Sequence, residues 1–86
     1  MKFWESQPIY LQIADHVCEK ILLQEWCPGQ PIPSVRELAI TLAVNPNTAM
    51  RSYEFLQQLD VVYNERGIGL SVSDKGIKNA LAYRRT

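Results

Sequence analysis

The stretch "SVRELAITLAVNPNTAMRSYEFL", residues 34–56, predicts two short helices joined by a tight turn. Ser34 is followed three residues later by Glu37, the spacing of a capping box, in which each side chain bonds the other residue's backbone amide. The Asn45-Pro46 pair interrupts the helical pattern, because proline disfavours a helical conformation in the residue before it and has no N–H to donate. A second helix begins there, with Asn45 as its N-cap and Pro46 at its first position.

The apolar residues of these two helices have the sizes that a close helix crossing requires. Ala39 is small where the helices must cross, and Val44 is apolar in the turn. Ala43 occupies a turn position where many such motifs have glycine. The expected buried face of the second helix is Ala49, Tyr53, Leu56 and Leu59. The stretch therefore predicts a helix-turn-helix.

An amphipathic helix is predicted upstream, within residues 6–26, where Pro8 suits the first turn. Its apolar stripe repeats every four positions and has smaller or apolar neighbours: Ile9, Ile13, Val17 and Ile21, with Ala14, Cys18 and Leu22 beside them. The segment "CPGQPIP", residues 27–33, contains three prolines and a glycine, which favour a loop with a short extended piece around residues 30–32. Trp4 and Trp26 are expected to pack or to form dimer contacts.

Downstream, "DVVYNERGIGLSVSD", residues 60–74, alternates in character and has glycines near its middle, as a β-hairpin does. A hairpin after a helix-turn-helix is a wing, so the expected fold class is α+β: a winged helix-turn-helix with a three-helix core. We expect this domain to span residues 1–73. Residues 74–86 are expected to start a further helix, with Ile77, Leu81 and Ala80 on one face.

Composition narrows the class of protein. The 86 residues suffice for one small domain, and 47% hydrophobic residues with 21% charge indicate a soluble globular chain. No apolar run approaches the roughly 18 residues that span a bilayer, and no signal peptide is visible, so we expect a cytoplasmic protein without membrane contact. Nine basic and nine acidic residues cancel, so the net charge gives no information about the kind of partner that the protein binds.

The chemistry-bearing residues indicate neither an enzyme nor a metal protein. The single histidine, the lack of suitably spaced carboxylate pairs and the lack of a phosphate-binding glycine loop leave no catalytic constellation. His16, Cys18 and Cys27 lack the spacing of a zinc site, and the cysteines are expected to be reduced. No cofactor is expected. A small-molecule effector site is not expected either, because the chain has no second domain to form a pocket.

Four segments of the chain form a recognisable pattern in their order and spacing: "PIYLQIADHVCEKIL", "PGQPIPSVRELA", "VNPNTAMRSYEFLQ" and "ERGIGLSV". Together they resemble the N-terminal winged-helix domain of the GntR family of bacterial transcription regulators, and most of all its YtrA-like branch. The resemblance covers about residues 7–73. It implies sequence-specific binding to a double-stranded DNA operator, most often as a repressor, and a homodimer formed through C-terminal helices beyond the wing.

The resemblance also implies a set of DNA-binding residues. In the family the arginine of the "PSxREL" motif contacts the DNA backbone, the start of the next helix enters the major groove, and the wing tip approaches the minor groove. The implied residues are Ser34 and Arg36 in the motif, Asn45, Asn47, Thr48 and Arg51 in the recognition helix, and Arg66, Gly67 and Gly69 in the wing. Asparagine can pair with adenine and arginine with guanine, which agrees with this assignment.

Several readings stay open. Many family members carry basic residues at the positions of Pro46, Met50 and Ile68, so a single domain is expected to bind DNA weakly and with a shallow salt dependence. These lost charges leave a protein-interaction module as the alternative function. Asn45 can act as a helix cap alone, and Arg36 and Arg66 can be ordinary surface residues.

Overall fold

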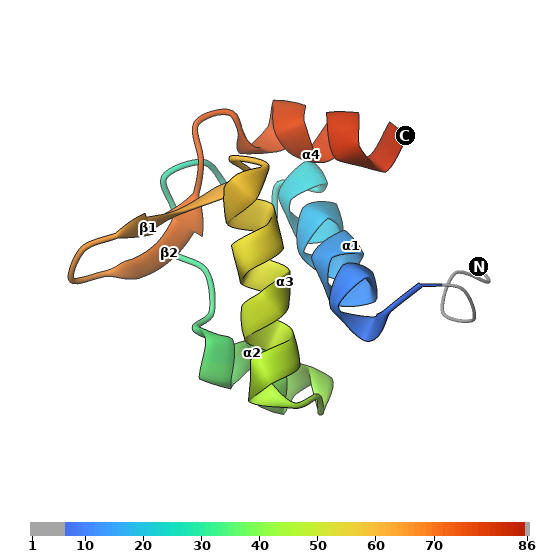
Figure 1. Cartoon of the computed structure of the whole chain (residues 1–86). Coiled ribbons are helices and arrows are strands. Elements are labelled where there is room, and N and C mark those ends of the chain that lie inside the picture. The colour runs from blue at the N-terminus through green and yellow to red at the C-terminus, as the bar shows by residue number, and fades with distance from the viewer. Residues whose placement is uncertain (1–6, 86) are drawn as a thin grey trace.

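The computed structural model describes residues 7–85. Its elements, in chain order, are α1 (Ile9–Leu22), α2 (Val35–Leu42), α3 (Pro46–Gln58), β1 (Val62–Glu65), β2 (Gly69–Val72) and α4 (Gly76–Arg85). In Figure 1, α1 and α3 stand side by side, α4 crosses their upper ends, and the hairpin projects to the left. The predicted winged helix-turn-helix fold is confirmed. The predicted role of Trp4 falls outside the described residues.

The ends of α2 and α3 have the predicted local chemistry. The Glu37 amide donates to Ser34 Oγ at 3.1 Å and the Ser34 amide donates to Glu37 Oε1 at 3.0 Å, so the capping box is complete. α2 ends at Leu42 and is capped by Ala43, whose φ of 57° and ψ of 46° are left-handed. Asn45 Oδ1 then accepts from the Asn47 amide at 2.8 Å, and Pro46 occupies the first helical position. The turn thus stops one helix and starts the next within three residues.

The core lies between α1 and α3 and extends beneath the hairpin. Its buried apolar residues from the helices are Ile13, Ala14, Val17, Cys18, Ile21, Leu38, Ala39, Ala49, Tyr53, Leu56 and Ala80. Leu59 and Trp26 are half-buried against this cluster. The prediction for Ile9 was wrong, since its side chain is 57% exposed. A four-residue spacing turns about 40° past a full helical turn at each step, which moves Ile9 away from the face that Ile21 buries.

The wing is antiparallel, with Val62 opposite Val72 and Glu65 opposite Gly69. The loop before α2 adds the predicted extended piece to its edge. The Ile32 amide donates to the Leu70 carbonyl at 2.9 Å and the Val72 amide donates to the Gln30 carbonyl at 3.0 Å. The hairpin is therefore tied to the segment that leads into α2.

The predicted further helix, α4, packs across α1. Ala80 is buried and Ile77 is half-buried, as expected. Leu81 is 45% exposed, so its predicted place on the packed face was wrong. The packed face instead carries Gly76, Ala80 and Tyr83, and Leu81 lies about 100° around the helix from Ala80. None of the helices within residues 7–85 is long and apolar enough to cross a membrane.

Candidate nucleic-acid interface

The first two turns of α3 present polar side chains away from the core. Asn47 and Arg51 are exposed and Thr48 is half-buried, whereas Ala49 and Tyr53 on the opposite face are buried. With Ile9 and Tyr10 from the start of α1, these three polar residues line one shallow, open hollow. The structure therefore brings together the residues that the sequence singled out at the start of α3.

Asn45 is engaged with its own helix. Its side-chain oxygen accepts the Asn47 amide at 2.8 Å, and the side-chain NH₂ makes no hydrogen bond within the described chain. The capping reading of Asn45 is thereby confirmed. Ser34 likewise caps its own helix, because its hydroxyl oxygen accepts a hydrogen bond from the Glu37 amide. Both residues remain exposed at the starts of their helices.

Arg51 has a partner that the sequence did not reveal. Its guanidinium carbon lies 4.4 Å from the centroid of the Tyr10 ring, a cation–π geometry. Among the described residues, no hydrogen bond or ion pair engages the guanidinium. The face of the Tyr10 ring therefore orients Arg51, while the N–H groups of Arg51 have no acceptor within the described chain.

Ser52 fixes the start of α1 against α3. Its hydroxyl is buried and lies 2.7 Å from the Tyr10 carbonyl oxygen and 3.1 Å from the Thr48 carbonyl oxygen. A buried serine on a helix is satisfied by such bonds to backbone oxygens. Sequence reading missed both Ser52 and Tyr10, because neither belongs to an apolar stripe or a basic cluster.

Arg36 stands in the first turn of α2 with its side chain exposed. The residue before the capping box is held by α3, since the Tyr53 hydroxyl donates to the Pro33 carbonyl oxygen at 2.7 Å. Arg36 does not line the hollow of Asn47 and Arg51, and it belongs to a separate surface on the neighbouring helix.

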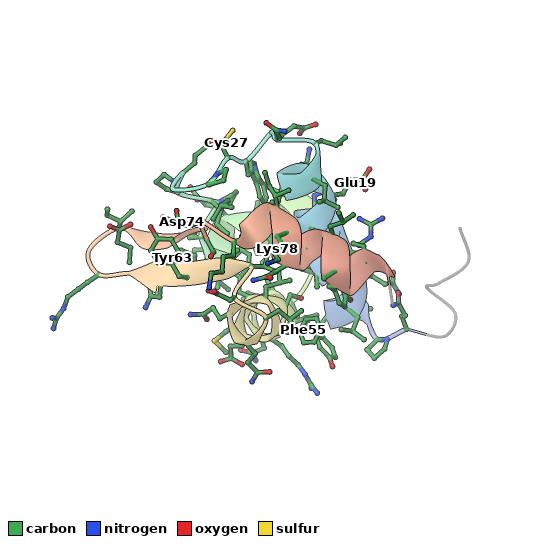
Figure 2. All side chains as sticks on the ribbon, turned by 90° about the horizontal axis from the view of Figure 1, so that it is seen from above. Glu19, Cys27, Phe55, Tyr63, Asp74 and Lys78 are labelled. Atoms are coloured by element: carbon green, nitrogen blue, oxygen red, sulfur yellow. The ribbon has the colours of Figure 1, made fainter. Side chains whose placement is uncertain are left out.

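The wing tip carries Arg66, Gly67 and Gly69, all exposed. Gly67 has a φ of 83° and Gly69 a φ of 107°, conformations that favour glycine, and the Ile68 amide donates to the Glu65 carbonyl at 3.0 Å across the turn. Figure 2, viewed from above, shows the hairpin extending away from α4 and α3. The structure thus places Arg66 at a site distinct from the start of α3.

The charges at these three places are not compensated by ion pairs. The one ion pair found within residues 7–85 joins Lys20 and Glu25, 2.9 Å apart at the surface. Arg36, Arg51 and Arg66 therefore keep their positive charge available. Guanidinium and amide groups of this kind can bind phosphates and base edges. Residues 7–85 contain no cluster of three or more histidine, cysteine or acidic side chains that could hold a metal ion.

The family model described as "Bacterial regulatory proteins, gntR family" matches residues 9–72. YhcF of Bacillus subtilis, an uncharacterized HTH-type transcriptional regulator, is 45% identical over 74 residues, covering 86% of this chain and 61% of YhcF. The HTH-type transcriptional repressor YtrA of the same organism is 39% identical over 69 residues, covering 80% of this chain and 53% of YtrA. This chain thus spans between about half and three fifths of these relatives.

Among solved structures, BusR of S. agalactiae in complex with its busAB-promotor DNA has the same fold. Its TM-score is 0.82 at 23% identity, with 92% of this chain and 38% of the BusR chain covered.

Proposed function

The chain belongs to the gntR family of bacterial regulatory proteins and forms the DNA-binding domain of a transcription regulator, and we propose that it binds a double-stranded operator in a sequence-specific way. In this proposal α3 enters the major groove and the wing approaches the minor groove. The observation that carries the proposal is the exposed polar start of α3, where Asn47, Thr48 and Arg51 gather beside each other. A recognition helix of a helix-turn-helix reads bases with these first turns.

The side chains suit particular base edges. Asn47 can pair with the N6 and N7 of adenine, and Arg51 can pair with the O6 and N7 of guanine. The methyl group of Thr48 can contact the methyl group of thymine. Because its oxygen caps the helix, Asn45 contributes mainly its NH₂ group to the groove.

Phosphate contacts come from outside the hollow. Ser34 and Arg36 approach the DNA backbone from the start of α2, and Arg66 does so from the wing, where Gly67 and Gly69 let the chain lie close to the groove. BusR, which shares the fold, was determined with promoter DNA, and this supports the docking of such a fold on a duplex. Few cations are available, so binding by a single domain is weak and a dimer doubles the contacts.

Repression is the proposed outcome of binding, supported by the name of the YtrA relative, a transcriptional repressor. We propose a homodimer formed through segments that follow the wing, acting on DNA in the cytoplasm. No small-molecule effector is assigned to this chain.

A protein-interaction module is the second candidate. Two exposed apolar residues favour it, because they stand at positions where a positive charge would strengthen DNA binding. Met50 on α3 is 44% exposed, and Ile68 at the wing tip is 57% exposed. Such residues contact protein more readily than phosphate.

One experiment separates the two candidates. The full chain is used to enrich bound duplexes from a random DNA pool, followed by sequencing. A two-fold symmetric motif would support operator binding by a dimer, because half-site symmetry mirrors protein symmetry. A pool without an enriched motif, even at low salt, would contradict the proposed function and leave the interaction module.

A further inference from the structure

The start of α1 holds Tyr10 against the recognition helix at three points. The buried Ser52 hydroxyl bonds its carbonyl at 2.7 Å. Phe55 packs edge-on against its ring, with centroids 6.1 Å apart and planes at 84°. Arg51 lies over the ring face at 4.4 Å. Since these three partners are neighbours on one side of α3, Tyr10 is fixed both in its backbone and in its ring orientation.

The contact with the Tyr10 ring orients Arg51 and leaves its N–H groups free to donate hydrogen bonds. A carboxylate partner would neutralise the guanidinium and occupy its N–H groups, whereas an aromatic face attracts the cation and leaves the edge of the fork available. Glu54 lies one helical turn from Arg51 and shares a shallow hollow with it, yet no ion pair forms between them. The N–H donors of Arg51 are therefore available to an acceptor outside the described chain.

We propose that Tyr10 is a positioning residue for DNA reading: its ring holds the planar fork of Arg51 for a guanine of the operator. This inference rests on the proposed function. Bidentate recognition of guanine needs both N–H groups in one plane, and a free arginine loses side-chain entropy when it adopts that geometry. A ring that restricts the guanidinium beforehand reduces this loss, so α1 takes part in specificity without contacting a base.

The test uses the full chain and a fluorescein-labelled duplex of the motif enriched by selection. Binding is measured by fluorescence anisotropy for wild type, Tyr10→Leu, Tyr10→Phe, Arg51→Ala and the double variant Tyr10→Leu/Arg51→Ala. Tyr10→Leu is expected to weaken binding about three- to tenfold, the cost of immobilising one arginine side chain that the ring no longer restricts beforehand. Tyr10→Phe keeps the ring and should bind within about twofold of wild type. In the Arg51→Ala background, Tyr10→Leu should add little further loss.

A second readout separates positioning from general stability. Duplexes with single base-pair changes should show that Arg51→Ala loses discrimination at one G·C pair, and that Tyr10→Leu loses discrimination at the same pair. A structural role would weaken all duplexes alike. If Tyr10→Leu does not fold, as judged by circular dichroism, Tyr10→Met replaces it, because an unbranched side chain adapts to the same space.

The inference is overturned if Tyr10→Leu binds as wild type does, if its loss is equal in both Arg51 backgrounds, or if Tyr10→Phe loses as much as Tyr10→Leu. These results require an enriched duplex that wild type binds. Failure of the selection itself would count against the proposed function, and the two failures are thus distinguishable.

Discussion

The hydroxyl oxygen of Tyr53 lies 2.7 Å from the carbonyl oxygen of Pro33 and donates a hydrogen bond to it. Tyr53 is 1% exposed, and burial raises the pKa of its phenol well above the ordinary value, with Glu37 as a lesser cause. The hydroxyl therefore stays protonated and remains a donor. This bond joins α3 to the residue before the capping box, so it helps to set where Arg36 stands relative to α3.

Removing that hydroxyl should destabilise the protein. Tyr53→Phe leaves the Pro33 carbonyl without its partner, and we expect a loss of about 1–3 kcal/mol in the free energy of unfolding, measured with urea. Tyr63→Phe is the matched control, since the Tyr63 hydroxyl donates to Glu65 Oε1 on the exposed hairpin (Figure 2). Its loss should be much smaller, because the Tyr63 hydroxyl is exposed to water. Equal losses in the two variants would show that the bond to Pro33 contributes nothing special.

The left-handed conformation of Ala43 offers a stabilising change. With φ of 57° and ψ of 46° at the end of α2, this residue adopts a conformation that costs an L-residue with a side chain about 1 kcal/mol relative to glycine. Ala43→Gly should therefore raise the thermal midpoint. Ala82→Gly, at an exposed position within α4, should lower stability by about 1 kcal/mol, because glycine disfavours a helix interior. The prediction fails if both substitutions shift stability in the same direction.

Gly76 is required by a close approach at the start of α4. A Cβ at this position would lie 2.8 Å from the Val61 carbonyl oxygen and 2.8 Å from Val72 Cγ1. Gly76→Ala should destabilise by about 1–3 kcal/mol despite the better helix propensity of alanine, because backbone and a buried side chain must shift. Lys78→Ala on the exposed side of the same helix should be nearly neutral in chemical denaturation. A neutral Gly76→Ala would mean that α4 can move away from Val61 at little cost.

Alkaline pH should weaken the fold through a buried thiol. Burial raises the pKa of Cys18 from 9.0 to about 12, with Asp15 adding to the rise and Arg84 opposing it. The unfolded chain loses this proton first, so the stabilising contribution is complete below about pH 9 and is lost as pH rises toward 12. The expected fall in the free energy of unfolding is about 1 kcal/mol between about pH 9 and pH 10.

Variants of the two cysteines test this origin. Cys18→Ala should be less stable than wild type at neutral pH, because it removes buried volume, but its stability should fall less between about pH 9 and pH 10. Cys27→Ala, in the exposed loop (Figure 2), should retain the full fall. An unchanged pH profile in Cys18→Ala would assign the alkaline loss to other groups.

The parts of the fold that depend on local chemistry could be predicted from the sequence. The capping box of Ser34 and Glu37 and the Asn45-Pro46 start of α3 involve residues within a few positions of each other, and both are confirmed. The extended piece before α2 was also predictable, since its prolines exclude a helix. The buried face of a helix was harder to predict. Leu81 has the spacing of a buried helical residue, yet the position of α1 decides which face of α4 packs.

The candidate site was predictable only in part. Asn47, Thr48 and Arg51 could be found because they lie off the apolar face of α3. The contact between Tyr10 and Arg51 could not, because it joins helices far apart in the sequence and an aromatic face over a cation has no spacing signature. Ser52 has a polar side chain that spacing arguments assign to solvent, although it bonds two backbone carbonyls in the core.

The most direct test of the interface is the loss of Arg51. Its guanidinium is exposed and lies over the Tyr10 ring, but it makes no hydrogen bond or ion pair within the described chain, so Arg51→Ala should cost at most about 1 kcal/mol of stability. Its affinity for an enriched duplex, measured by fluorescence anisotropy, should fall about five- to 150-fold, the cost of one bidentate base contact. Lys20→Ala changes the net charge equally at the far end of α1, where a surface pair with Glu25 contributes little to stability. If both variants lose the same affinity, the effect is one of net charge and Arg51 reads no base.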